Sequence, residues 1–290
     1  MALEVQQRLS LKNDFLFKRL FGDPDNKDIL IGLLNAILQS TGRKEITDLT
    51  VSDNYKLARK LVDDKEGILD IHCETYDHEL INVEMQVRRY PDMEKRSIFY
   101  MGKLFISSIR RGDPYSDLKK TICINLLDYS FLPLKQFHSS FHLYEDSNKQ
   151  LMLTDMWELH FIEFEKFRKE TFDIQQPLHR WLWYMDGQIN SHQLKELIRM
   201  DPLFRKAEKR LTKLSADEET LILYEAREKA IRDQNSLVIA AGQDGVKKGM
   251  EMGIEKGIES VAMNMLQKGA DLNFITEVTG LSVEQINMLK

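Results

Sequence analysis

The amino-acid sequence predicts an α/β sandwich with a mixed central sheet flanked by helices, followed by an all-helical C-terminal region. Two observations carry this prediction. Up to residue 176, segments with helical apolar spacing alternate with segments that have the two-residue periodicity of strands. From Pro177 onward, the apolar residues follow helical spacing only. We therefore expect two domains, residues 1–176 and residues 177–290.

The composition is that of a folded chain that buries its own core. Of 290 residues, 42% are hydrophobic and 30% are charged, which excludes a disordered chain. No run approaches the roughly 18 consecutive apolar residues of a membrane span, and the N-terminus lacks the apolar stretch of a secretory signal. Cys73 and Cys123 lie in apolar runs, as buried thiols of a reducing compartment do. We therefore expect a cytoplasmic protein that does not contact membranes.

Two helices are predicted before the first strand. Residues 16–21 repeat apolar side chains at i,i+4 spacing, and a polar break follows at residues 22–26. Five apolar residues then form one helical stripe: Ile29, Leu30, Leu33, Leu34 and Ile37. Gly42 stands where a helix C-cap is expected, and a strand is expected around Leu49–Val51.

The most informative segment is a predicted β-hairpin. Residues 68–75 and 81–88 alternate strictly between apolar and polar side chains, and residues 76–79 carry turn chemistry. Alternation separates a buried face from a polar face. The polar face consists of Asp70, His72, Glu74, Asn82, Glu84, Gln86 and Arg88.

Asp70 shares this face with Glu84 and Gln86 if the connecting loop has an odd number of residues, centred near Asp77 or His78. Opposed carboxylates repel each other, and a divalent cation would turn that repulsion into attraction. However, any half-buried antiparallel hairpin has a polar face that water can solvate. The spacing alone therefore leaves both a metal site and a solvated surface open.

The predicted sheet continues after the hairpin. Pro91 begins a helical segment that includes Met93–Ile109, and Thr121–Leu127 is nearly all apolar, like a central strand covered on both faces. Alternation at Phe137–Tyr144 and Leu159–Phe164 predicts two further strands.

The C-terminal region contains a series of small residues spaced four apart. These are Gly245, Gly249, Gly253 and Gly257, each followed by an apolar residue. Such a series fits closely packed helices that self-associate, or simply a weak helix, since each internal glycine costs about 1 kcal/mol. Gly269, Gly280 and the capping-box pattern Ser282-x-x-Gln285 delimit two short helices. These two helices carry few basic residues, which favours a protein-contact module over a DNA reader.

An ordered series of sequence blocks points to a family. The blocks are KNDFLFKRLFG at residues 12–22, DKEGILD at 64–70, Asp70 with Glu84-x-Gln86, KRSIFY at 95–100, TDMWELHFIE at 154–163, and the C-terminal stretch from residue 255 to 282. Together they resemble the recombination-promoting nucleases, also described as PD-(D/E)xK nuclease family transposases. The resemblance covers nearly the whole chain. It implies a restriction-endonuclease-like core and cleavage of double-stranded DNA that depends on Mg²⁺ (or Mn²⁺).

The resemblance also implies roles for individual residues. Asp70 and Glu84 would ligate the metal from adjacent strands, and Gln86 stands where many relatives of the broader nuclease class have lysine. Because an amide cannot supply positive charge, the charge would come from the metal or from another basic residue. Arg96 and Lys103, seven residues apart on one helix face, are candidates, although they could also be solvated helix charges.

Three further positions are ambiguous. Asp14 either contributes a carboxylate from the first helix or caps that helix. His72 is either a group beside the site or an ordinary surface residue. Asp63 and Asp64 fit turn residues better than metal ligands.

Segment 88–120 is basic within an acidic chain. It contains nine basic and four acidic residues, 9 − 4 = +5, whereas the whole chain carries −5. It is either a phosphate-binding surface beside the hairpin or a solvated amphipathic helix, and no base-reading motif is evident.

We therefore expect a Mg²⁺-dependent DNA endonuclease that dimerises with itself through the C-terminal helical region and is linked to recombination, mobile elements or phage defence. The alternatives are a catalytically inactive protein of the same fold that binds DNA or self-assembles, and a ribonuclease.

Overall fold

The computed structural model of the chain describes residues 8–39, 43–52 and 71–289. The chain divides into two compact units, residues 1–228 and 229–290. This division differs from the predicted boundary between residues 176 and 177. The reason is that α6 (Pro177–Asp186) and α8 (Pro202–Ser215) contribute side chains such as Trp181 and Phe204 to the same hydrophobic core as the sheet.

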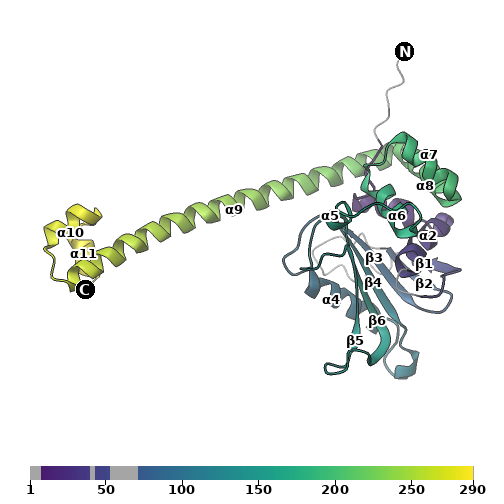
Figure 1. Cartoon of the computed structure of the whole chain (residues 1–290), viewed down its shortest axis with the longest axis horizontal. Helices are drawn as coiled ribbons and strands as arrows, with labels where there is room; N and C mark the ends of the chain where they lie inside the picture. The colour runs from purple at the N-terminus through teal and green to yellow at the C-terminus, as the bar shows by residue number, and fades with distance from the viewer. Residues whose placement is uncertain (1–7, 40–42, 53–70, 290) are drawn as a thin grey trace, which may run out of the picture. The chain divides into compact units, whose positions relative to one another are not determined.

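The first unit is built on a mixed β-sheet, as the sequence predicts (Figure 1). In the described residues the strand order is β1-β2-β3-β4-β6-β5. The strands are β1 (Leu49–Val51), β2 (Ile71–Thr75), β3 (Leu80–Gln86), β4 (Thr121–Leu127), β5 (His138–Tyr144) and β6 (Met152–Glu163). β4 lies parallel to β3 and β6, and the other neighbouring pairs are antiparallel. Every residue of β4 is buried, as expected for a continuously apolar strand covered on both faces.

Helices cover both faces of this sheet. Among its described residues, the first unit contains α1 (Asp14–Phe21), α2 (Lys27–Leu38), α4 (Met93–Ile106), α5 (Phe164–Phe167), α6, α7 (Ser191–Met200), α8 and the start of α9 (Glu218–Gln267), with short 3₁₀ turns at Pro24–Asn26 and Tyr115–Asp117. The apolar stripe of α2 packs with the strands in one large core. On the other face, Met93 of α4 packs with Leu127 and Phe161. The restriction-endonuclease-like architecture expected from the sequence is confirmed.

The register of the hairpin meets the predicted condition. Ile71 pairs with Val83 and Glu74 pairs with Leu80, so the paired residues are centred on Asp77. Because side chains alternate between faces, His72 and Glu74 of β2 share one face of the sheet with Asn82, Glu84 and Gln86 of β3. Gly42, Asp63, Asp64 and Asp70 lie outside the described residues. Cys73 and Cys123 are buried free thiols, as predicted.

The second unit has a small core of its own. Helix α9 (Glu218–Gln267) begins in the first unit, and its end packs with α10 (Leu272–Thr279) and α11 (Val283–Met288) around Ala262, Ile275 and Ile286. Gly269 and Gly280 have φ values of 75° and 73°, the left-handed conformation that a helix-ending glycine supplies. The predicted capping box, Ser282 with Gln285, is present. In the part of the chain that the structure describes, no helix is long and apolar enough to cross a membrane.

Candidate active site

Glu84 is a buried carboxylate in the middle of the sheet. It lies on β3 between β2 and β4, and only 4% of the residue is exposed. Asn82 on the same face is also 4% exposed, because α4 packs over β3 and β4. The polar side chains of β3 are therefore not part of a solvated surface. A buried carboxylate requires compensating partners, since its desolvation is costly.

The partners of Glu84 compensate its charge only in part. The Nε2 atom of Gln86 donates a hydrogen bond to Oε1 of Glu84 at 3.0 Å, and Nη2 of Arg96 lies 3.5 Å from the same oxygen. Burial raises the pKa of Glu84 above its ordinary value, and the negative charge of Asp14 adds to this shift. Arg96 and Gln86 offset it incompletely. The predicted residues Glu84, Gln86 and Arg96 are thus brought together.

Asp14 lies near this group but is held by α9. Asn13, not Asp14, caps α1, because its Oδ1 accepts a hydrogen bond from the backbone N–H of Leu16 at 3.2 Å. The predicted capping role of Asp14 is therefore wrong. The Nε atom of Arg227 donates to the two carboxylate oxygens of Asp14 at 2.8 and 3.0 Å, and Nη2 contacts one of them as well. The negative charge of Asp14 nevertheless acts on Glu84 and helps to raise the pKa of Glu84.

Two residues of the site were missed in the sequence. Asn125 of β4 pairs with Glu84 in the parallel register and is 2% exposed. Its Oδ1 accepts a hydrogen bond from Ser97 Oγ of α4 at 3.1 Å. Tyr129 follows β4, and burial together with the charge of Glu84 raises the pKa of its hydroxyl to about 12. For Asn125 the sequence did contain a signal, namely an amide in the middle of an almost entirely apolar strand. A buried polar side chain of this kind needs a specific partner.

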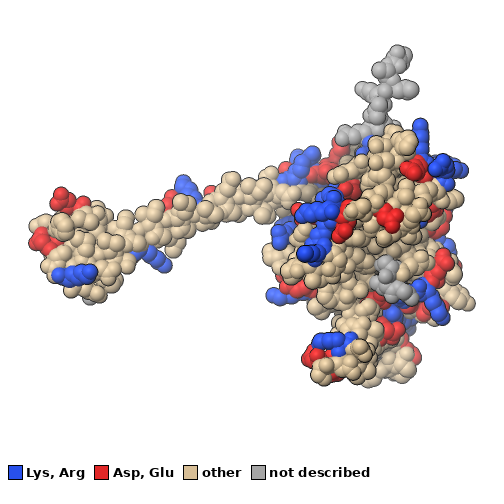
Figure 2. Space-filling view, in the orientation of Figure 1, with Lys and Arg blue, Asp and Glu red and all other residues tan. Residues whose placement is uncertain are grey.

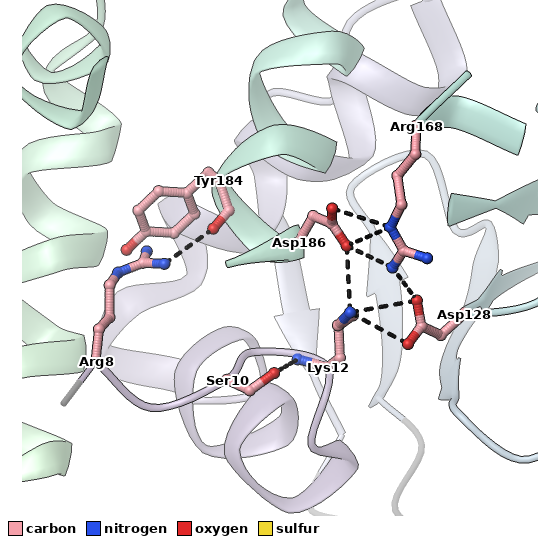
Figure 3. A network of polar contacts seen from close by, with 7 residues as sticks. All are labelled: Arg8, Ser10, Lys12, Asp128, Arg168, Tyr184 and Asp186. Atoms are coloured by element: carbon pink, nitrogen blue, oxygen red, sulfur yellow. Dashed lines mark hydrogen bonds and ion pairs between the residues drawn. The ribbon is translucent and has the colours of Figure 1, made fainter. Parts of the chain in front are cut away.

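An ion-pair network holds the chain next to the site (Figure 3). Lys12 Nζ lies 3.2 Å from a carboxylate oxygen of Asp128 and 3.2 Å from one of Asp186. Arg168 donates from Nε to both oxygens of Asp186 at 3.1 Å and also contacts Asp128. Burial would raise the pKa of Asp186, but Arg168 and Lys12 hold it below its ordinary value. Because the backbone N–H of Asp128 donates to the carbonyl of Gln86 at 3.0 Å, this network anchors the end of β3.

A second buried carboxylate provides a contrast. Glu158 of β6 lies on the opposite face of the sheet from Glu84, because Glu84 aligns with Asn125 and Phe161 across the parallel strands. Arg43 Nη1 lies 2.9 Å and Lys120 Nζ 3.3 Å from its Oε2. Burial alone would raise the pKa of Glu158. The hydrogen bond from His160 and the two cations outweigh burial and hold this pKa at about 2. The neighbours of Glu158 therefore favour its charged form.

Two of the remaining predicted residues lie on α4 and β2. Lys103 is two turns along α4 from Arg96, and its Nζ lies 4.7 Å from the ring centroid of Phe99. His72 is half-buried on β2, and burial lowers its pKa to about 4. Asp70 lies outside the described residues. Within those residues, no group of three or more His, Cys, Asp or Glu side chains could hold a metal ion.

The basic segment 88–120 is partly neutralised. Lys119 Nζ lies 2.6 Å from a carboxylate oxygen of Glu74, and Lys120 contacts Glu158. On the face of the first unit shown in Figure 2, Lys and Arg side chains are interspersed with Asp and Glu. Any contact with nucleic acid on this face therefore depends on local groups rather than on one continuous positive field.

The comparisons with known proteins agree with this architecture. A family model described as a PD-(D/E)XK nuclease family transposase matches residues 11–241, which is most of the chain. The match includes all strands of the sheet and the helices that cover it. No curated protein and no solved structure matches the chain.

Proposed function

The chain belongs to the PD-(D/E)XK nuclease family transposases, and on this basis we propose that it is a divalent-metal-dependent endonuclease that hydrolyses phosphodiester bonds in double-stranded DNA. Family membership supports a nuclease-type function. The observation that carries the finer proposal is the burial of Glu84 on a central strand with incomplete charge compensation. A carboxylate held in this way is costly to the fold and is typical of active sites.

Glu84 and Asp70 are the residues that we assign to the metal. Asp70 directly precedes Ile71 in the chain, and Ile71 pairs with Val83, the neighbour of Glu84. Carboxylate oxygens are the ligands that Mg²⁺ and Mn²⁺ prefer, and PD-(D/E)XK nucleases typically use divalent metals. The bound ion would lower the pKa of a water molecule and stabilise negative charge on the phosphate. Asp14, whose charge acts on Glu84, is a further candidate carboxylate for this site.

The remaining roles follow from charge. Gln86 donates to Glu84, and its amide orients groups without supplying positive charge. Arg96 is the cation in contact with Glu84 and is therefore the first candidate to stabilise negative charge on the phosphate. Lys103 is the second candidate, because it lies on the same flank of α4.

Plasmid cleavage tests this proposal directly. We expect the purified full-length protein to nick supercoiled plasmid with Mg²⁺ or Mn²⁺ and to be inactive in EDTA. Glu84→Gln and Asp70→Asn are each expected to reduce the rate by at least about 100-fold, the scale on which removal of a catalytic group acts. Asp77→Asn is the matched control, since it changes an exposed carboxylate of the same hairpin.

Each other outcome has a definite meaning. Unchanged cleavage by both Glu84→Gln and Asp70→Asn would reject the assigned site. If the wild-type protein cleaves nothing with any divalent metal tested, the catalytically inactive alternative, which binds DNA or self-assembles, is favoured. Preferential cleavage of RNA in the same assay would identify a ribonuclease.

We also infer that the second unit mediates formation of a homodimer. Helix α9 exposes large apolar side chains, each at least 61% exposed: Leu237, Ile239, Val246, Met250 and Ile254. Figure 2 shows few charged side chains along the middle of α9. Covering such residues is favourable, and a second copy of the same helix offers a matching apolar surface. Space is open around Gly245, Gly249 and Gly253, which permits close approach of another backbone.

A further inference from the structure

We propose that one flank of α4 is a stacking platform for unpaired bases, so that the substrate of this nuclease is duplex DNA with an adjoining single-stranded segment. This inference rests on the proposed function and names the substrate class of the same site. The observation is a run of aromatic rings and cations that begins at the candidate active site.

The platform combines aromatic faces with positive charges. The guanidinium carbon of Arg96 lies 5.0 Å from the ring centroid of Tyr90 and 4.9 Å from that of Tyr100. The Nζ atom of Lys103 lies 4.7 Å from the ring centroid of Phe99. Residues 96, 99, 100 and 103 share one flank of the helix, because residues three and four apart are neighbours. The flank therefore presents rings and cations side by side.

Phe99 is the accessible ring of this set. It is 53% exposed, although the exposure of an apolar phenyl ring to water is unfavourable. Its neighbour Tyr100 packs edge-on against it with ring centroids 5.5 Å apart, which fixes the orientation of Phe99. This half-exposed, oriented ring, with the Lys103 ammonium over it, offers contacts to the two parts of a nucleotide, the base and the phosphate.

The chemistry favours an unpaired strand over an intact duplex. Duplex DNA presents phosphates and the edges of its bases, and the flat faces of its bases are stacked on one another. Inside a duplex both faces of each base are covered, and only the terminal base pair has one open face, whereas an unpaired base presents a face that can stack on Phe99 at any position along the strand. Each base–aromatic stack contributes about 1–3 kcal/mol to binding, and the adjacent Arg96 and Lys103 can bind the strand's phosphates.

The location ties the platform to the candidate active site. Arg96 is 3.5 Å from Glu84 Oε1, and Phe99 lies about one helical turn beyond it. One turn advances about 5.4 Å. An unpaired base on Phe99 would therefore lie close to the bond to be cleaved.

Binding measured without cleavage tests the platform. The probes are a blunt duplex and the same duplex with a single-stranded overhang that contains 2-aminopurine, each titrated with full-length protein in EDTA. We expect the overhang to bind at least about fivefold more tightly, the equivalent of one stack, and the 2-aminopurine fluorescence to be quenched. Phe99→Ala and Phe99→Leu should both remove the preference and the quenching, and Phe99→Trp should retain them.

Two aromatic residues elsewhere serve as matched controls. Tyr115 is 85% exposed and lies outside α4, and Phe105 is on the other flank, against Trp157. Tyr115→Ala and Phe105→Leu should keep the preference for the overhang. Equal binding of the two probes by the wild type, or unchanged quenching in Phe99→Leu, would overturn the platform.

The two proposals fail in different ways. Cleavage of blunt and overhanging DNA at equal rates, with equal binding of both, would reject the platform and leave the endonuclease proposal standing. Quenching that depends on Phe99, without cleavage under any divalent metal, would support the platform and reject the endonuclease proposal.

Discussion

At the scale of single residues, two buried glutamates on one sheet differ in what surrounds them. Glu84 has one guanidinium contact at 3.5 Å and a raised pKa. Glu158 contacts Arg43, Lys120 and His160, and its pKa is held at about 2. A group that stabilises the fold has its charged form favoured by its surroundings, as Glu158 does. Glu84 has its charged form disfavoured, which fits the catalytic role that we propose for it.

This contrast predicts opposite effects of the same substitution on stability. Glu84→Gln removes a charge that burial disfavours, so the melting temperature should rise or stay unchanged while cleavage is lost. Glu158→Gln breaks a compensated buried ion pair and should lower the free energy of unfolding by about 3 kcal/mol. Calorimetry of both variants at neutral pH checks this pair. A marked loss of stability in Glu84→Gln would show that Glu84 is structural.

The lowered pKa of His138 predicts how the free energy of unfolding depends on pH. Burial, followed by the neighbouring His160, lowers the pKa of His138 to about 4, from an ordinary value of 6.5. The ring nitrogens of the two histidines face each other at 2.9 Å, and Glu158 lies on the far side of His160. Between pH 6.5 and 4 the unfolded chain binds a proton at this position and the folded chain does not.

The free energy of unfolding should therefore fall as pH is lowered through this window, by about 1.4 kcal/mol per pH unit from this group. Urea denaturation at several pH values between 7 and 4 would measure the slope. His138→Gln lacks the titrating ring and should show a shallower slope. An identical slope in wild type and variant would contradict the assignment.

At the scale of elements, local patterns predicted the strands well and the ends of longer elements less well. Leu49–Val51 and Thr121–Leu127 are strands with the predicted bounds. The predicted helix to Ile109 ends at Ile106, because the hydroxyls of Ser107 and Ser108 donate to the carbonyls of Leu104 and Phe105 and compete with helical bonding. β6 begins at Met152 rather than Leu159, because its pairing with β5 continues through a register shift that disrupts alternation.

At the scale of the whole molecule, we propose that the second unit mediates formation of a homodimer. The full-length protein should sediment as a dimer, and Met250→Glu together with Ile254→Glu should shift it toward the monomer, because charges in an apolar helix contact are costly. Glu251→Gln is the control, since it lies between them in sequence and is already polar. A monomeric wild type, or a dimer that both substitutions leave intact, would contradict the role of α9.

The sequence by itself determined the α/β class and the hairpin, because burial of one face imposes a periodicity that can be read over a few neighbouring positions. The candidate catalytic residues came from the resemblance of ordered sequence blocks to a nuclease family, and they remain a prediction. Only the tertiary structure decided which of these residues meet. Asn125 beside Glu84, Arg227 on Asp14, and α6 within the sheet's core are contacts between positions far apart in the chain. Such contacts leave no local periodicity, since they depend on how whole elements pack and on where a buried charge finds its partner.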